Sequence, residues 1–181
     1  MKDDSFNTNY LAIHKELMAL KNPKVAKSNQ RFFKTEKGDY GEGDLFIGLR
    51  VPDIRRIAKK HILLKLSDVK KLIRSKYHEE RLAGLILMVM QYQKSNNDID
   101  KKKIFDAYLD LFPYINNWDL VDTSCYKIIG PHLENKRRRF LYQWAKSENL
   151  WTRRISIITT LWFIRKGDLE DSFALAKIHL N

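Results

Sequence analysis

The 181-residue sequence has little cysteine, glycine or proline and no long hydrophobic run. The one cysteine, Cys125, cannot form a disulfide within the chain, which excludes a disulfide-stabilised fold and fits a reducing compartment. No stretch approaches the ~20 apolar residues of a membrane-spanning helix, and the polar N-terminus does not resemble a signal peptide. We therefore expect a cytoplasmic protein with no membrane segment, in which Cys125 has a packing role.

Motifs for metal, cofactor or nucleotide binding are absent as well. The five histidines have no metal-ligand spacing, and Cys125 stands alone. The chain has neither a P-loop nor a serine nucleophile motif. Four of the seven glycines lie within residues 34–52, but their spacing matches no nucleotide-binding fingerprint. We expect a long loop there, and we expect no metal or cofactor.

Acidic residues are too few to balance the basic ones: 22 aspartates and glutamates stand against 34 lysines and arginines, which leaves a net charge of +12. Such a surplus favours a polyanionic partner, most often nucleic acid. Two basic clusters lie near predicted helix starts, where positive charge does not help the helix dipole. Each cluster either binds a phosphate backbone or is a solvated face, and the sequence leaves both open. The clusters are "KKK" at 101–103 and the run Lys136, Arg137, Arg138 and Arg139.

What the sequence does have is a helical pattern. Apolar residues recur at intervals of three and four along most of the chain, and no alternating strand pattern appears. This predicts an all-α protein, and 44% hydrophobic residues can supply the core of a single domain over residues 1–181. Asn117 and Asn149 suit N-caps, and Gly130-Pro131 suits a helix end. The predicted helices are 8–20, 23–33, 52–62, 67–75, 79–94, 99–112, 117–129, 135–146, 150–165 and 169–180.

The later helices also indicate a repeat. Three of them begin near His78, Asn116 and Asn149, at separations of 38 and 33 residues, and each has a shorter amphipathic neighbour. This period suits stacked helix pairs. Stacked pairs form a curved solenoid that presents one helix of each pair along a concave surface.

Two of these helices carry residues that break their own apolar pattern. At about 100° per residue, Trp118 and Asp122 face the same way, at the rim of an apolar stripe. Asp119 points elsewhere, and its place in the first turn is explained by the helix dipole. On the later helix, Arg154 falls near the middle of an apolar arc, where a cation needs a partner or an anionic ligand. From the residues alone, Trp118 and Asp122 are either packing and an ion-pair partner or a site.

Several segments resemble the HEAT-like-repeat DNA alkylation repair enzymes, the AlkD type of DNA glycosylase. The resemblance covers most of the chain, and it is most specific where the Gly-rich lead into "FIGLRVPDIRR" is combined with "NNWDLVD". The segment "ENLWTRRISIITTLWFIRKGD" extends it towards the C-terminus.

The resemblance implies a fold, an activity and a site. The fold is a right-handed superhelix, or solenoid, of HEAT-like antiparallel helix pairs, whose basic concave face holds duplex DNA. The activity is hydrolysis of the N-glycosidic bond of cationic N3- and N7-alkylated purines by a monomer, without metal or cofactor. Trp118 and Asp122 match the family's catalytic tryptophan and carboxylate, and Arg154 matches an arginine on the DNA-facing surface. In the family a further repeat supplies a second tryptophan, so we expect a member truncated after "FALAKIHLN".

Two other functions fit the same sequence. One is a non-catalytic HEAT-like module that binds DNA without excising a base, and the other is a protein-interaction scaffold. The first predicts salt-sensitive binding without base release, and the second predicts no DNA affinity at low salt.

Overall fold

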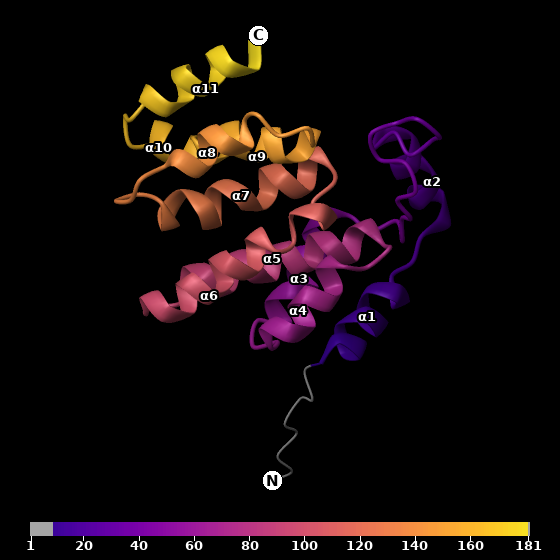
Figure 1. The fold of residues 1–181 in the computed structure, drawn as a ribbon. Helices are drawn as coiled ribbons and strands as arrows, with labels where there is room; N and C mark the ends of the chain where they lie inside the picture. The colour runs from indigo at the N-terminus through magenta and orange to yellow at the C-terminus, as the bar shows by residue number, and fades with distance from the viewer. Residues whose placement is uncertain (1–8, 181) are drawn as a thin grey trace. The chain divides into compact units, whose positions relative to one another are not determined.

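The computed structural model describes residues 9–180, and this part of the chain is helical with no strands (Figure 1). An isolated parallel bridge joins Leu45 and Tyr77. The all-α prediction is therefore confirmed; residue 8, expected in the first helix, lies outside the described range. The helices are α1 (Tyr10–Ala19), α2 (Pro23–Phe32), α3 (Val51–Lys60), α4 (Leu66–Ile73), α5 (His78–Lys94), α6 (Asp98–Leu109), the 3-10 turn η1 (Phe112–Tyr114), α7 (Trp118–His132), α8 (Arg139–Trp144), α9 (Leu150–Thr159), α10 (Leu161–Ile164) and α11 (Glu170–Leu180).

The chain divides into two compact units, Met1–Gln91 and Tyr92–Asn181, with the boundary inside α5. Among the described residues, no helix has the length and apolar character needed to cross a membrane.

In the first unit, a buried carboxylate at the start of α5 anchors the loop that leads into α3. Glu79 accepts hydrogen bonds from the backbone N–H groups of Ile47 and Gly48, both at 2.8 Å, and of Leu49 at 3.3 Å. All four residues are buried. Buried backbone donors need partners, and a loop has no helical or sheet neighbour to supply them. Glu79 therefore fixes the end of the loop predicted at 34–52.

The residues around Glu79 form a second buried polar group that the sequence did not predict. Arg81 Nη2 donates to Asp44 Oδ2 at 2.5 Å, and His78 Nδ1 lies 3.3 Å from the same oxygen. The rings of Phe33 and Phe46 pack against His78, with centroids 4.8 and 4.7 Å away. Charges buried this deeply are tolerated only when they are paired, and here the pairing ties the loop to α5.

Gly48 lies where the start of α2 meets this loop. Its φ is +92°, and a Cβ added there would lie 2.1 Å from the carbonyl oxygen of Asn22 and 2.7 Å from the nitrogen of Ala26. The N–H of Asn22 in turn donates to the carbonyl of Ile47 at 3.0 Å. Only glycine suits both the left-handed conformation and the close approach.

Replacing Gly48 with alanine is therefore expected to lower the free energy of unfolding by far more than replacing Gly38. Gly38 also has a positive φ, +86°, but a Cβ there would meet nothing within 4 Å. Gly38→Ala should cost about 1–2 kcal/mol from conformational strain alone. Gly48→Ala should cost about 1–3 kcal/mol more, because backbone atoms must move apart. Urea unfolding of the two variants measures the difference, and equal losses would contradict the close packing of α2.

In the second unit, α7 runs parallel to α9 and α10 with a constant offset along the chain. The helices pack side by side (Figure 1). Three contacts along them share an offset of 32 residues. A constant offset requires two helices that run in the same direction and in register, whereas antiparallel helices would give a changing one. The three contacts are Asp122 with Arg154, Gly130 with Trp162, and Glu134, just beyond α7, with Lys166.

The predicted end of α7 at residue 129 is wrong by three residues. Pro131 lies inside the helix, which continues to His132. Proline past the first turn lacks the N–H donor of the helix, and its ring crowds the carbonyl four residues earlier, so the helix ends one residue after Pro131. The N–H of Leu133 then donates to the carbonyl of Ile129 at 2.9 Å and closes the last turn.

The helix predicted over 150–165 is interrupted at Thr160, where α9 ends and α10 begins. Three hydroxyl groups donate to backbone carbonyls within this stretch: Ser156 to Arg153 at 2.6 Å, Thr159 to Ile155 at 2.7 Å and Thr160 to Ile157 at 2.7 Å. Such back-bonding competes with the helical N–H groups and bends helices. The hydroxyl residues of "SIITT" could have indicated this interruption, but the apolar periodicity of the same stretch predicted a continuous helix.

Candidate active site

Asn117 is the N-cap of α7. This residue is fully buried, and its Oδ1 accepts a hydrogen bond from the N–H of Trp118 at 2.9 Å. Asp119 lies in the first turn, and its Oδ1 accepts from the N–H of Leu120 at 2.8 Å. Both side chains satisfy donors that the helix start leaves unpaired. The sequence predicted the N-cap at Asn117, and it placed Asp119 in the first turn on account of the helix dipole alone. Asp122, the other acidic residue of "NNWDLVD", instead bonds a side chain of another helix.

Asp122 forms a two-pronged ion pair with Arg154 across the α7–α9 interface. Arg154 Nε donates to Oδ1 at 2.9 Å and Nη2 donates to Oδ2 at 2.7 Å. This fork geometry fixes the carboxylate in one orientation. The hydrogen bonds to Asp122 raise the pKa of Arg154, so its guanidinium stays charged. Within the described part of the chain, Nη1 of Arg154 makes no hydrogen bond.

The Asp122–Arg154 pair is only partly buried, and this limits its value for stability. The two side chains are 34% and 37% exposed. Pairs with this much exposure contribute about 0–1 kcal/mol, because water screens them. Folding stability therefore gives little reason for the pair, and its exposure keeps the carboxylate within reach of a ligand.

Trp118 lies one helical turn before Asp122, with its side chain half-buried. Residues four apart on a helix share a face, so the indole and the carboxylate are neighbours on α7. Tyr126 continues this line by one more turn, and the guanidinium of Arg165 lies 4.9 Å from the centre of its ring. The sequence prediction did not single out Tyr126, although its spacing from Asp122 is the same. The face therefore alternates aromatic and acidic groups along α7, with Arg154 and Arg165 beside them.

Cys125 lies beneath this face and is fully buried. Burial raises the pKa of its thiol to about 12. A thiol that stays protonated at neutral pH is a poor nucleophile. The packing role predicted for Cys125 is confirmed.

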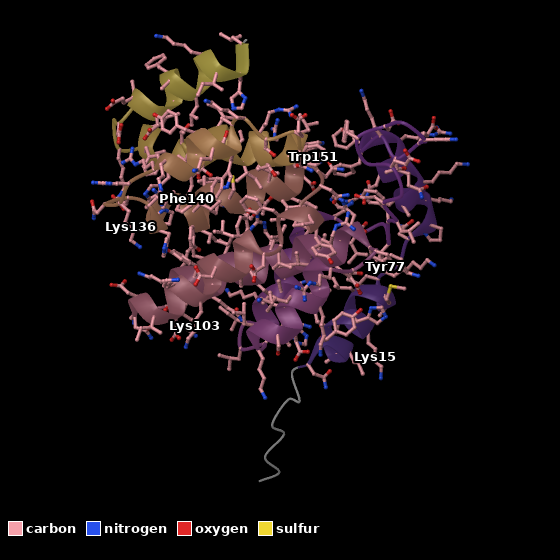
Figure 2. All side chains as sticks on the ribbon, in the orientation of Figure 1. Lys15, Tyr77, Lys103, Lys136, Phe140 and Trp151 are labelled. Carbon is pink, nitrogen blue, oxygen red and sulfur yellow. The ribbon has the colours of Figure 1, made fainter. Side chains whose placement is uncertain are left out.

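Lys136, Arg137 and Arg138 lie in the turn before α8, and not in the helix predicted over 135–146, whereas Arg139 is the first residue of α8. Lys136 projects from this turn (Figure 2), and its Nζ donates to His132 Nε2 at 3.1 Å. Arg137 is exposed and has no ionic partner among the described residues. Arg139 is exposed at the start of α8, with its guanidinium 5.6 Å from the ring of Phe140. These three cations are therefore accessible to a ligand.

Arg138 differs from its neighbours because its guanidinium is used inside the protein. Nη1 donates to Asp168 and to Asp171, both at 2.6 Å, and the guanidinium lies 3.6 Å from the centre of the Phe163 ring. The side chain is 19% exposed. Arg138 holds the start of α11 against α8 and α10, which is a structural task.

The structure indicates no metal site: the described residues contain no group of three or more histidines, cysteines or acidic residues that could hold an ion. The groups that the candidate site does offer are a carboxylate, aromatic rings and guanidinium groups.

A search of curated proteins finds no match to the chain. A family model described as DNA alkylation repair enzyme matches residues 13–181, which is nearly the whole chain. The matched region contains α7, α9 and every residue of the site described above. The chain belongs to the DNA alkylation repair enzyme family.

Proposed function

We propose that the protein is a DNA glycosylase that hydrolyses the N-glycosidic bond of cationic N3- and N7-alkylated purines in duplex DNA. One observation carries this proposal: within a DNA alkylation repair family, a half-exposed carboxylate, Asp122, is held in a fixed orientation by Arg154 on the face that carries Trp118. A rigid negative charge beside an indole suits a reaction in which positive charge develops on the substrate.

The proposed chemistry follows from the charge of the lesion. An alkylated purine already carries a positive charge, so it leaves with the electron pair of the glycosidic bond and needs no general acid. The bond breakage leaves positive charge on the sugar, next to the carboxylate of Asp122 and the ring face of Trp118. Fixed charge placed where new charge develops stabilises the transition state. A water molecule then adds to C1′ of the sugar, and its proton passes to Asp122 or to solvent.

Arg154 has two parts in this proposal. Nε and Nη2 orient the carboxylate of Asp122, and Nη1 is left to donate to a phosphate of the DNA backbone. Arginine suits both tasks because its donors form a planar fork of fixed geometry. Binding of the backbone would thus be linked to the position of the catalytic carboxylate.

The arrangement of the helices is also part of the proposal. The register of 32 residues between α7 and α9–α10 supports a HEAT-like repeat of that length, with α8 as the connecting helix. The N-caps Asn117 and Asn149 occupy the same place in the two repeats. Repeats of this kind stack into a right-handed superhelix with a concave face, where we place the duplex.

Asp122→Asn is expected to reduce base release roughly 100-fold or more, because the amide keeps the shape of the side chain but loses its charge. Release of 7-methylguanine from a duplex oligonucleotide, measured under single-turnover conditions, checks this. Asp119→Asn is the matched control, since Asp119 lies on the same helix turn but bonds the backbone of Leu120. The control should release base at the wild-type rate.

Two outcomes count against the proposal. Wild-type release by Asp122→Asn would remove Asp122 from the chemistry. Tight, salt-sensitive duplex binding by the wild type without any release would identify a non-catalytic DNA-binding member of the family.

We further propose that Arg137 and Arg139 contact phosphates of the bound duplex. The double variant Arg137→Gln/Arg139→Gln should weaken DNA binding. It should also make the slope of log K against log salt concentration less negative by roughly 2, since each lost phosphate contact removes about 0.9 from the slope. Arg138→Gln should instead lower the free energy of unfolding by roughly 1.5–3 kcal/mol. It removes the cationic partner of Asp168 and leaves Asp171 with the hydrogen bond from the hydroxyl of Tyr142 alone. Fluorescence anisotropy and urea unfolding distinguish the two effects, and an unchanged salt slope in the double variant would contradict the proposed contacts.

A further inference from the structure

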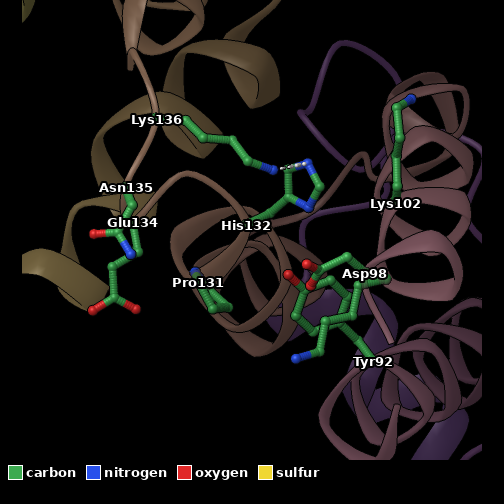
Figure 3. Close-up of a pocket in the computed structure, with 9 residues that line it drawn as sticks. Tyr92, Asp98, Lys102, Pro131, His132, Glu134, Asn135 and Lys136 are labelled. Atoms are coloured by element: carbon green, nitrogen blue, oxygen red, sulfur yellow. Dashed lines mark hydrogen bonds between the residues drawn. The ribbon is translucent and has the colours of Figure 1, made fainter. Parts of the chain in front are cut away.

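A second, basic cleft lies at the other end of α7 from Trp118, within the second unit. It is a cavity of about 440 Å³ (Figure 3) between the end of α5, the start of α6 and the turn that follows α7. An adjoining hollow of about 220 Å³ shares Tyr92, Lys101 and Pro131 with it and adds Lys127 and Trp162. From Asp122 to His132 the helix rises about 15 Å, so the cleft is distinct from the candidate active site.

Two of the charged residues that line the cavity are already compensated. Lys102 pairs with Asp106 on α6 at 2.6 Å. Glu134 pairs with Lys166, and it also accepts from the indole N–H of Trp162 at 3.4 Å. Neither residue adds to the net charge that a ligand would meet.

The remaining charges are mainly positive. Lys101, Lys127 and Lys136 have no carboxylate partner in the described part of the chain. Among the residues that line the two cavities, Asp98 is the one acidic group without a salt bridge. Three ammonium groups against one carboxylate give the cleft a net attraction for an anion.

Lys136 is held in position at the rim by His132. Its Nζ donates to His132 Nε2 at 3.1 Å, and the two side chains point towards one another in Figure 3. The imidazole is itself fixed, because it stacks on Phe105 with ring centroids 3.8 Å apart. A lysine that is already ordered loses less side-chain entropy when it binds a ligand.

The wall of the cleft also offers a neutral donor and apolar surface. Burial, followed by the charge of Asp98, raises the pKa of Tyr92 to about 12, so the phenol keeps its proton at neutral pH. The rings of Pro131 and Trp162 line the adjoining hollow. A few polar groups on a partly apolar wall, in a volume of this size, are typical of a small-ligand site.

We propose that this cleft is a phosphate-binding site, in which Lys101, Lys127 and Lys136 hold the phosphate group of a nucleotide unit. Ammonium groups act as point charges and suit a phosphate. Lys101 and Lys136 line the larger cavity, and Lys101 and Lys127 line the adjoining hollow. The phosphate belongs either to the backbone of a DNA duplex or to a free nucleotide. The duplex source rests on the proposed function, since about 15 Å corresponds to roughly four base-pair steps and one duplex can reach both places. The free-nucleotide source does not depend on it.

His132 provides a local reporter of ligand binding. Burial first, and then the charges of Lys136 and Lys102, lower its pKa to about 4, while Asp98 and Asp106 act in the opposite direction. A bound phosphate adds negative charge beside the ring and should raise this pKa by roughly 1–2 units. The C2 proton of the imidazole, followed by NMR during a pH titration, measures the shift, and His132→Asn identifies its signal.

The experiment adds inorganic phosphate, deoxyadenosine monophosphate or an unmodified 16-base-pair duplex to Asp122→Asn protein, in which base release is expected to be strongly reduced. We expect at least one of the three to raise the pKa of His132. A shift with the nucleotide or with phosphate, but not with the duplex, identifies a free ligand. A shift with the duplex, but with neither small molecule, identifies the DNA backbone. No shift with any of the three overturns the proposal.

Charge-matched variants test whether the cleft lysines carry the binding. Lys101→Gln/Lys127→Gln/Lys136→Gln should abolish the ligand-induced shift and weaken ligand binding at least tenfold, and Lys101→Gln alone should weaken it partly if the triple variant does not fold. The control, Lys27→Gln/Lys59→Gln/Lys146→Gln, removes the same charge from exposed lysines that do not line the cleft. An equal loss in the control would show a general effect of charge and would overturn the site.

Base release by the wild type is measured separately, so the two proposals fail independently. A shift of the His132 pKa without any base release supports the phosphate site and contradicts the proposed glycosylase activity. Base release without a shift supports the glycosylase activity and contradicts the phosphate site.

Discussion

The close approach of α7 to α10 at Gly130 determines which residues of the two helices meet. A Cβ on Gly130 would lie 2.3 Å from the Cβ of Trp162, so any other residue would push the helices apart. Because α9 and α10 both run parallel to α7, this contact sets the same offset along α9, where Arg154 meets Asp122 two turns earlier. The geometry of the candidate active site therefore depends on a glycine that takes no part in its chemistry.

The first unit also contains a close approach of two backbone segments at a glycine, and there it is combined with a buried charge. At Gly48 the start of α2 touches the loop, and Glu79 satisfies the donors that this contact buries. Burying a carboxylate is unfavourable unless it is hydrogen-bonded, and three backbone donors meet that condition here. The pairing of Arg81 with Asp44 extends the polar group and ties the same loop to α5. A glycine-rich segment that looks flexible in the sequence is thus held at its end.

The sequence predicted what depends on local spacing and missed what depends on contacts between distant segments. Asn117 and Asn149 were recognised as N-caps, and the shared face of Trp118 and Asp122 followed from helical geometry. The ionic partners of Arg138 lie 30 and 33 residues further along the chain and could not be predicted. The sequence of a basic run does not show which of its members are solvated and which are paired. The burial of Glu79 was missed for the same reason, since the residues it bonds lie about 30 positions earlier.

The pairing of Asp122 with Arg154 also limits how the proposed catalysis can work. An isolated carboxylate would attract a cationic sugar strongly, but a guanidinium at 2.7 Å cancels much of that field. In the proposed complex, a backbone phosphate bound at Nη1 of Arg154 would balance the guanidinium. The negative charge of Asp122 would then act on the substrate undiminished. The full electrostatic effect would thus arise only with DNA bound, so that the duplex itself completes the site in which its damaged base is removed.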